Sequence, residues 1–395
     1  MASMAGLEPR RWIGVGHSAA TDSREAGADA ARAATVGRDP RLVVVLASIA
    51  HDHRAVLDGV RSVTGSTPLI GCSTHSELWR GGPSDGTVLV TVLGGQGFAA
   101  TTAAAPGAAG RQRGAGVELA RALRGSDAQR PRSAMLLLTD SLLRDQEEIL
   151  RGVYEVFGAS VPVVGGAAAD RWAMDKTFQF VDDEVLHGSA VGAMLHSDGP
   201  IGIAVGHGWR PVGEPMTVTR CENGRVLTLD DEPAMDAFLR RAGAPDEAYT
   251  DVGAFHRFAL TRPIGIERRA GTEVRNLCTE VDAVGRSIGG GGEIPQGALV
   301  WLMEGDADSI LEAATDTCDE AIGALEGREP LGLLVFSCSA LRSVLGPDGT
   351  VREGDRIAAA AAAAPFAGFH TCGEIARTRG IDGFHNQTHV VLALA

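Results

Sequence analysis

Cysteine, lysine and long apolar runs are scarce in this sequence. The chain of 395 residues contains six cysteines, none of them in a Cys-x-x-Cys pair. This spacing favours free thiols in a reducing compartment over a disulfide framework or a zinc site. No stretch reaches the roughly 18 apolar residues of a membrane-spanning helix, and residues 1–11 lack the apolar segment of a secretory signal. We therefore expect a cytoplasmic protein that does not insert into a membrane.

Positive charge is also in short supply. Lysine and arginine together number 36, against 50 aspartates and glutamates, so the formal net charge is −14. Lys176 is the only lysine. An acidic chain repels a phosphate backbone, which argues against a nucleic-acid partner. The hydrophobic content of 44% is that of an ordinary globular protein, and the length predicts two or three domains.

The clearest positive signal is a unit that occurs three times along the chain. Each copy contains an apolar strand, a helix, a turn that ends in glycine, and a closing strand. These segments are 42–46, 52–63, 67–71 and 87–93 in the first copy, 135–138, 147–157, 161–165 and 189–195 in the second, and 333–336, 358–364, 365–368 and 388–394 in the third.

This order predicts the fold class. Two strands separated by a helix favour parallel pairing, because the crossover needs a dozen or more residues. The closing strand follows by a shorter link and is expected to return antiparallel. The sequence therefore predicts a mixed α/β protein with stacked mixed sheets and flanking helices, built from repeated strand–helix–strand–strand units. A cluster of glycine and proline at 206–213 predicts a boundary between domains 1–212 and 213–395.

The ends of these strands contain the candidate binding residues. The first and third copies share Gly-x-x-Thr-x-x-Glu, at 71–77 and 368–374, whereas the second copy lacks the threonine and the glutamate. Ligands of α/β sheets bind at the carboxyl ends of parallel strands, and an arginine there can pair with a ligand carboxylate. The predicted ligand-binding residues are Cys72, Ser73, Thr74, Glu77, Cys338, Arg342, His370, Thr371, Cys372 and Glu374.

The segment 370–374 leaves several alternatives open. Its imidazole, thiol and carboxylate alternate at His370, Cys372 and Glu374, so an extended strand would project them to one side. Such a set fits a metal site, a cysteine nucleophile beside a base, a ligand pocket or a buried polar network. The lone histidines that remain as haem ligands or as structural residues are His207, His256 and His385.

Two further segments have local explanations. The glycine run 289–292 lacks the Gly-Lys-Ser/Thr of a phosphate-binding loop, and it predicts a mobile hairpin loop. The acidic run 304–308 fits either a cation site or the capping of a helix N-terminus, and it lacks the EF-hand pattern.

The order of several short motifs resembles that of a FIST-domain protein, with an N-terminal and a C-terminal FIST half. The motifs are 14–18, 68–74, 161–168 and 206–209 in the first half, and 229–234, 335–338, 365–369, 373–375 and 384–388 in the second. The resemblance implies a cytoplasmic sensory module. It also implies a small ligand such as an amino acid, and a histidine kinase or another signalling output protein as the partner. Some relatives bind haem and respond to nitric oxide.

Three functions therefore compete. The leading one is a ligand-binding sensor, because the glycine-turn pockets are duplicated and no convincing catalytic set accompanies them. A haem-binding nitric-oxide sensor and an enzyme using Cys338 or Cys372 are the alternatives. We assign no catalytic residue, no metal ligand and no resident cofactor, and we expect the output to come from a separate partner. The oligomeric state, including a homodimer, stays open.

Overall fold

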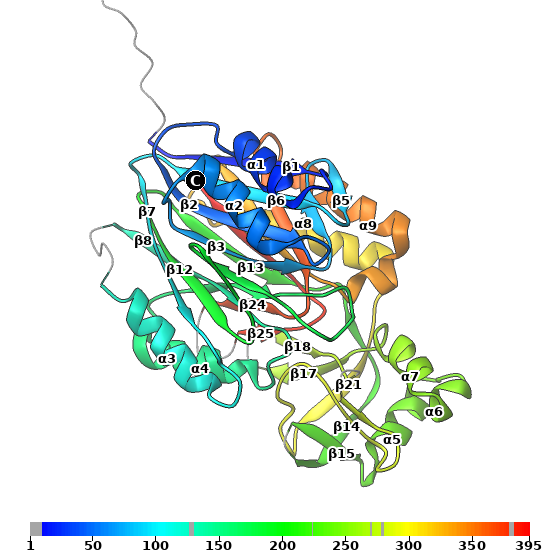
Figure 1. The fold of residues 1–395 in the computed structure, drawn as a ribbon. Coiled ribbons are helices and arrows are strands. Elements are labelled where there is room, and N and C mark those ends of the chain that lie inside the picture. Colours follow the sequence, from blue (N-terminus) through cyan, green and yellow to red (C-terminus); the bar gives the residue numbers. More distant parts are fainter. Residues whose placement is uncertain (1–9, 126–129, 223, 269–270, 278–279, 379–382) are drawn as a thin grey trace, which may run out of the picture.

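The computed structural model describes residues 10–125, 130–222, 224–268, 271–277, 280–378 and 383–395. Figure 1 shows a large body of packed sheets with outer helices, and a smaller lobe built from the middle of the chain. The predicted mixed α/β class is confirmed. None of the helices in the described ranges is long and apolar enough to cross a membrane.

The body consists of three repeats with the same order of elements. The first repeat comprises β1 (Trp12–Ser18), α1 (Ser23–Ala34), β2 (Pro40–Ser48), α2 (His53–Thr64), β3 (Leu69–Thr74), β4 (Glu77–Trp79), β5 (Gly82–Ser84) and β6 (Val88–Gly94). The second comprises β7 (Phe98–Ala105), α3 (Gln112–Leu123), β8 (Arg132–Thr139), α4 (Gln146–Phe157), β9 (Val163–Ala167), β10 (Gln179–Val181), β11 (Glu184–Leu186) and β12 (Ala190–Ser197). The third comprises β13 (Ile201–Gly206), α8 (Ala307–Gly323), β22 (Gly332–Cys338), α9 (Leu341–Ala360), β23 (Phe366–Thr371), β24 (Glu374–Arg377), β25 (Phe384–His385) and β26 (His389–Leu394).

Each repeat supplies four strands of a six-stranded sheet. The predicted parallel pairs are present as β2–β3, β8–β9 and β22–β23, and the closing strand pairs antiparallel with the first strand of each pair. The repeat is longer than the sequence indicated, because a further strand and helix precede each parallel pair. We number the three sheets after the repeat that contributes the parallel pair.

The last two strands of each sheet come from a different repeat. The hairpin β4–β5 of the first repeat pairs with β23 of the third sheet. Hairpin β10–β11 of the second repeat pairs with β3 of the first sheet, and hairpin β24–β25 of the third repeat pairs with β9 of the second sheet. This exchange is cyclic, so no sheet is complete without a neighbouring repeat.

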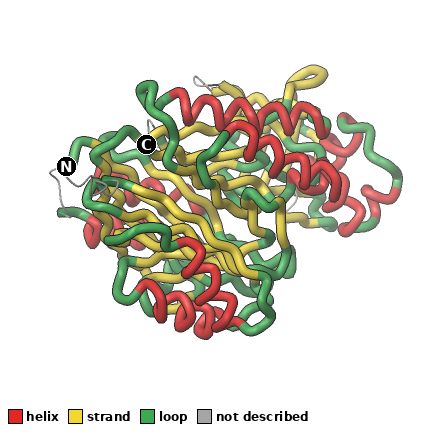
Figure 2. The backbone as a smooth tube through the Cα atoms, turned by 90° about the horizontal axis from the view of Figure 1, so that it is seen from above, coloured by secondary structure: helices red, strands yellow, loops and turns green. Residues whose placement is uncertain are grey.

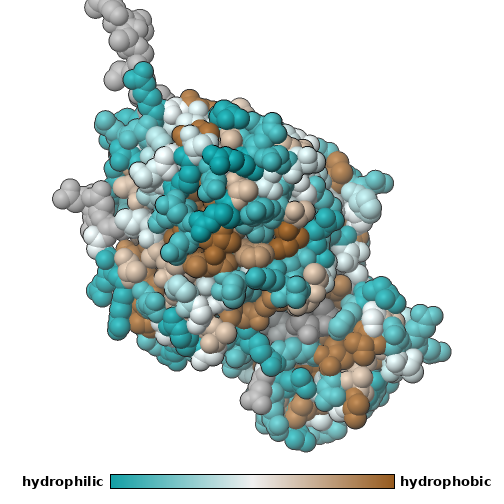
Figure 3. All heavy atoms as spheres, viewed as in Figure 1, coloured by the Kyte–Doolittle hydropathy of each residue, from teal (hydrophilic) through white to brown (hydrophobic). Residues whose placement is uncertain are grey.

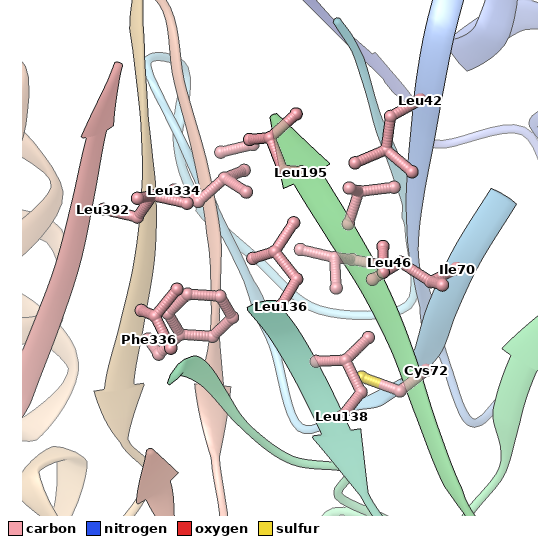
Figure 4. Close-up of a cluster of buried hydrophobic side chains, with 14 of the residues drawn as sticks. Leu42, Leu46, Ile70, Cys72, Leu136, Leu138, Leu195, Leu334, Phe336 and Leu392 are labelled. Atoms are coloured by element: carbon pink, nitrogen blue, oxygen red, sulfur yellow. The ribbon is translucent and has the colours of Figure 1, made fainter. Parts of the chain in front are cut away.

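The main hydrophobic core lies between the three sheets. Its side chains come from all of them, as Figure 4 shows for Leu46, Leu136 and Phe336. The rings of Phe336 and Phe369 pack edge to face, and their centroids are 5.8 Å apart. The helices cover the outer faces of the sheets, and Figure 2 shows them along the outside of the packed strands. Strands buried on both faces explain the continuous apolar runs in the sequence.

Glycines at one equivalent position allow the parallel strands to approach. A Cβ atom built at Gly71 would lie 2.2 Å from the carbonyl oxygen of Val45. The corresponding distance is 1.9 Å at Gly165 and 2.2 Å at Gly368, in each case to the carbonyl oxygen of the partner strand. The glycine that ends each predicted turn is therefore explained by the same close contact in all three repeats.

Residues 210–304 form an inserted lobe between β13 and α8. Its elements are β14 (Arg210–Glu222), β15 (Arg225–Leu229), β16 (Glu232–Pro233), α5 (Ala234–Arg241), α6 (Glu247–Thr250), α7 (Val252–Ala259), β17 (Ile264–Arg268), β18 (Gly271–Arg275), β19 (Glu280–Asp282), β20 (Ser287–Gly289) and β21 (Leu299–Glu304). The lobe has a core of its own around Phe238 and Phe255. Figure 3 shows hydrophobic side chains gathered on the lobe and across the middle of the visible face of the body.

The structure differs from the expected organisation in two places. The boundary expected at residues 212 and 213 lies inside β14, and β13 pairs with β26 from the far end of the chain. The helix of the third copy starts at Leu341 rather than in the alanine run, and Gly346 introduces a kink with φ 65°. The acidic run caps a helix, since the Asp306 side chain accepts a hydrogen bond from the Ser309 backbone N–H.

Candidate functional site

A cavity of about 560 Å³ lies between the body and the inserted lobe. It opens at the carboxyl ends of β8 and β22, where α/β sheets bind their ligands. The body contributes Ser141, Trp172, Met174, Cys338, Ser339 and Cys372 to the lining. The lobe contributes Asn276, Glu280, residues 290–292 and Glu293.

Two of the predicted residues, Cys338 and Cys372, meet in this cavity. Cys338 ends β22, and the Ser339 hydroxyl lies 3.5 Å from the Cys372 sulfur. Burial raises the pKa of the Cys372 thiol to about 12 and that of the Cys338 thiol well above its ordinary value. Both thiols are therefore protonated at neutral pH, which is the opposite of what a nucleophilic cysteine requires.

Ion pairs join the body to the lobe at the rim of the cavity. Arg144 of the body pairs with Glu280 of the lobe. Arg151 of α4 lies 2.7 Å from Glu293, whose backbone N–H donates to the Glu147 carboxylate over 2.8 Å. Each of these two arginine–glutamate pairs thus neutralises its own charges across the gap. Ligand-dependent movement of the lobe would have to break or rearrange these contacts.

The first Thr-x-x-Glu motif is a closed hydrogen-bond network. Glu77 is buried, and it accepts hydrogen bonds from the hydroxyls of Thr74 and Thr87 and from the Thr87 backbone N–H. Burial raises the pKa of Glu77 to about 7, although these hydrogen bonds act in the opposite direction. Neither Thr74 nor Glu77 lines the cavity.

The Thr-x-x-Glu motif of the third repeat has a different hydrogen-bond pattern. Glu374 accepts hydrogen bonds from the Thr388 backbone N–H at 3.2 Å and from the Thr388 hydroxyl at 3.0 Å, both on Oε2. The Thr371 hydroxyl donates instead to the carbonyl oxygens of Ala167 and Gly373. Burial raises the pKa of Glu374 to about 8. Its carboxyl lies close enough to Cys338, which lines the cavity, to raise the pKa of that thiol further.

Cys72 and Ser73 of the first repeat have structural surroundings. Cys72 packs in the core between the sheets, where Figure 4 shows it beside Leu138. The Ser73 hydroxyl donates to the carbonyl oxygen of Ala169 and accepts from the Phe178 backbone N–H, both at 3.0 Å. These bonds join the first and second repeats, and neither residue lines the cavity.

The structure separates His370, Cys372 and Glu374 instead of placing them on one side of a strand. The reason is that β23 ends at Thr371 and the chain turns at Gly373, with φ 145°, into the second sheet. Cys372 consequently faces the cavity, and Glu374 faces Thr388. His370 turns toward α9, where its partner lies.

His370 belongs to a buried charged cluster around Glu353 of α9, a residue that sequence reasoning missed. His370 Nε2 lies 3.0 Å from one carboxylate oxygen of Glu353. The Ser337 hydroxyl donates to the other oxygen over 2.6 Å, and His389 Nδ1 lies 3.4 Å from it. Burial raises the pKa of Glu353, but the two histidines and Ser337 outweigh it and lower the pKa to about 2. Glu353 is therefore ionised.

Arg342 lies just outside the cavity. It occupies the first turn of α9, directly after the lining residues Ser339 and Ala340. Its Nη1 atom lies 3.2 Å from the carboxylate of Asp85, which Arg171 approaches to 3.9 Å. Arg171 precedes Trp172, another cavity residue that the sequence reasoning did not select.

Two of the lone histidines, His207 and His385, are held by backbone groups. His207 Nε2 and His385 Nε2 each lie 3.1 Å from a backbone carbonyl oxygen, and His207 Nδ1 accepts from the Trp209 backbone N–H. His256 lies on α7 of the lobe. Among the described residues, no histidine lines the cavity.

Asn386 was not selected from the sequence, and the mobile hairpin loop expected at the glycine run 289–292 is not what the structure shows. Asn386 is only 6% exposed, and it lines the cavity. A Cβ atom built at Gly291 would lie 2.7 Å from its side-chain nitrogen. The run 290–292 is therefore a packed wall rather than a free loop. Four consecutive glycines were the available signal, since a close backbone approach requires them. Of the six cysteines, Cys278 lies outside the described residues, and the other five are free thiols.

This fold and cavity define a mixed α/β protein with a three-repeat body, an inserted lobe and a cavity between them. The chain belongs to the FIST family: the FIST N domain matches residues 41–232 and the FIST C domain matches residues 234–377. FIST domains are associated with signal transduction and small-ligand sensing. The family resemblance of the sequence is thereby confirmed.

Relatives exist in a bacterium and an archaeon. An uncharacterized protein of Mycobacterium tuberculosis, found in strains CDC 1551 and H37Rv, is 26% identical over 396 residues, covering 95% of this chain and 97% of the relative. An uncharacterized protein of Methanocaldococcus jannaschii is 25% identical over 170 residues, covering 41% of this chain and 33% of the relative.

Proposed function

We propose that the protein is a cytoplasmic sensor that binds a small, amino-acid-like metabolite in the cavity between body and lobe. Binding of the metabolite in this cavity is communicated to a separate signalling protein, for which a histidine kinase is the first candidate. The observation that carries this proposal is the position of the cavity. It is walled by two parts of the chain with separate cores, so a bound molecule contacts both at once.

The lining supports binding rather than covalent catalysis. The thiols at the floor are protonated, and the charged groups Arg144, Arg151, Glu280 and Glu293 are paired with one another. A cavity with an apolar wall, a few polar groups and a volume of this size is typical of a small-molecule site. A ligand that strengthens or breaks the body–lobe ion pairs changes the surface offered to a partner.

A thermal-shift screen of the purified full chain against amino acids, small metabolites, metal ions and haem tests the proposal. A ligand at 100 times its Kd adds about 2.7 kcal/mol to the unfolding free energy, or about two degrees or more in Tm for a chain of this size. Cys372→Phe fills the cavity floor and should abolish the shift. Cys221→Phe, on β14 outside the cavity, is the matched control.

Two results would count against the proposal. No stabilisation by any compound class would remove the small-ligand function, and a shift that survives Cys372→Phe would place the ligand elsewhere. Stabilisation by haem alone, with a Soret band, would instead favour the haem-binding sensor.

A further inference from the structure

Two arginines from different repeats share one carboxylate at the edge of the cavity. Arg342 Nη1 lies 3.2 Å from Asp85 Oδ1, and Arg171 Nη2 lies 3.9 Å from Asp85 Oδ2. Asp85 follows β5 of the first repeat, Arg171 follows β9 of the second, and Arg342 lies in α9 of the third. Each repeat therefore contributes one residue to this group. Partial burial raises the pKa of Asp85, but Arg342, together with Ser76 and Arg171, outweighs this effect and holds the pKa below its ordinary value. Two positive charges thus face one negative charge.

The start of α9 adds no negative charge beside the two arginines. Its first turn, which precedes the break in the helix at Gly346, contains no acidic residue. His75 stands nearby, and burial followed by the charge of Arg342 lowers its pKa to about 4. The imidazole is therefore neutral at pH 7 and adds no charge.

The segment that contains Arg171 is held in an unfavourable backbone conformation. Arg171, Trp172 and Met174 have φ angles of 60°, 67° and 51°, although none of them is glycine. Non-glycine residues in this region persist only where the surroundings enforce them, and they cluster at functional sites. The result here is that Arg171 reaches Asp85, while Trp172 and Met174 line the cavity.

Trp172 and Met174 give the same edge an apolar surface. Their exposed fractions are 37% and 50%, which places them among the large hydrophobic side chains that remain accessible. The Trp172 ring stands edge-on to His75 at 5.9 Å. An aromatic face beside a pair of arginines suits a molecule with an apolar part and an anionic group.

We propose that Arg171 and Arg342 form an oxyanion subsite, occupied in this structure by Asp85, and that a ligand carboxylate or phosphate displaces Asp85 while the rest of the ligand packs on Trp172 and Met174. The inference rests on the proposed function, because it specifies the chemistry of the cavity ligand. Asp85 acts as an internal competitor. Partly exposed ion pairs contribute little, so a ligand anion that engages both guanidinium groups replaces Asp85 at low cost.

Binding of three matched probes to the full chain, measured by calorimetry at millimolar concentration, tests the subsite. The probes are phenylacetate, phenyl phosphate and the neutral phenylacetamide. Asp85→Asn should tighten binding of an anionic probe roughly 3- to 10-fold, and Arg342→Gln should weaken it by a similar factor. Comparison of phenylacetate with phenyl phosphate distinguishes a carboxylate site from a phosphate site.

The same helix offers matched controls. Arg352 of α9 forms a 3.0 Å ion pair with Asp308, away from the cavity lining. Arg352→Gln and Asp308→Asn should leave probe binding unchanged, and equal Tm values would show that all four variants fold.

Three outcomes would overturn the inference. These are equal affinity for phenylacetamide and phenylacetate, no anion binding by the Asp85→Asn variant, and equal effects of the Arg342 and Arg352 substitutions. The inference would also be overturned by a metabolite whose binding is abolished by Cys372→Phe but is unchanged by Asp85→Asn and Arg342→Gln. That last result would leave the sensor function in place.

Discussion

The first and third repeats contain the same Thr-x-x-Glu motif in two electrostatic states. Glu77 receives three hydrogen bonds from two threonines on its two oxygens, whereas Thr388 donates both of its hydrogen bonds to a single oxygen of Glu374. Thr74 donates to its glutamate and Thr371 does not, because the Thr371 hydroxyl donates to the carbonyl oxygens of Ala167 and Gly373. The motif therefore determines where a carboxyl lies, and the neighbouring repeat determines how it is hydrogen-bonded.

The third repeat also contains a charged cluster at positions where the first repeat is uncharged. By strand register, Ser337 and His370 of the third repeat correspond to Ala47 and Ser73 of the first. Among substitutions that separate the two repeats, Glu353→Ala is expected to have the largest effect on stability. It leaves two histidines and a hydroxyl buried without their acceptor, at a cost of about 3–5 kcal/mol.

Urea unfolding would measure this loss. Glu320→Ala, on the exposed face of α8, is the control and should change the unfolding free energy by less than about 0.5 kcal/mol. If Glu353→Ala were as mild as its control, the cluster would not distinguish the third repeat energetically.

The turn glycines test what the repeats have in common. Gly71→Ala and Gly368→Ala each push a Cβ atom against a carbonyl oxygen of the neighbouring strand. We expect each to cost about 1–3 kcal/mol. Gly114 of α3 has no atom within 4 Å of a built Cβ, so Gly114→Ala should stabilise the protein by about 0.4–1 kcal/mol. Very different losses at Gly71 and Gly368, measured by urea unfolding, would contradict the equivalence of the two turns.

The pH dependence of stability sharpens the comparison between the two glutamates. Burial raises their pKa values from 4.5 to about 7 for Glu77 and about 8 for Glu374. The folded state therefore holds more protons than the unfolded state between pH 4.5 and 8. Their contribution is complete below pH 4.5 and is lost as the pH rises through 7 and 8, so the unfolding free energy should fall across that window.

Valine at the two threonines should have the smallest effects, about 1 kcal/mol each, but different pH profiles. Thr74→Val removes a hydrogen bond that lowers the pKa of Glu77, so the loss of stability should move to higher pH. Thr371→Val should leave the midpoint in place, because that hydroxyl donates to backbone carbonyl oxygens and not to Glu374. Urea titrations over a pH series would measure both, and equal displacement of the two profiles would contradict the difference between the motifs.

Much of the architecture could be predicted from local sequence. The repeated strand–helix–strand order and the turn glycines led to the mixed α/β class and the parallel pairs. The cyclic exchange of hairpins could not be predicted in this way. Which sheet accepts a three-residue strand such as β4 depends on what lies beside it in space, and its own residues do not specify that partner. The inserted lobe was hidden for a related reason, since β13 lies far in sequence from β26, its strand partner.

The site was predicted less completely. Cys338 and Cys372 were selected because they lie at the ends of parallel strands, and both line the cavity. Trp172 was missed because it lies on a connection without a motif, and its left-handed backbone leaves no trace in the sequence. The position of Glu353 in the sequence did indicate a buried polar partner. It lies four residues before Ile357 on the buried face of α9, and a carboxylate on an apolar helix face requires a buried partner.

The hairpin exchange has a consequence for the order in which the protein matures during synthesis. Strand β4 leaves the ribosome about 290 residues before β23, the strand that it must pair with. At typical elongation rates this interval lasts roughly 15 to 60 s. During that time the edge that will accept β23 is exposed, and unpaired edges of this kind are prone to aggregation. The third sheet can therefore be completed only after residues 366–394, which include β23 to β26, have emerged.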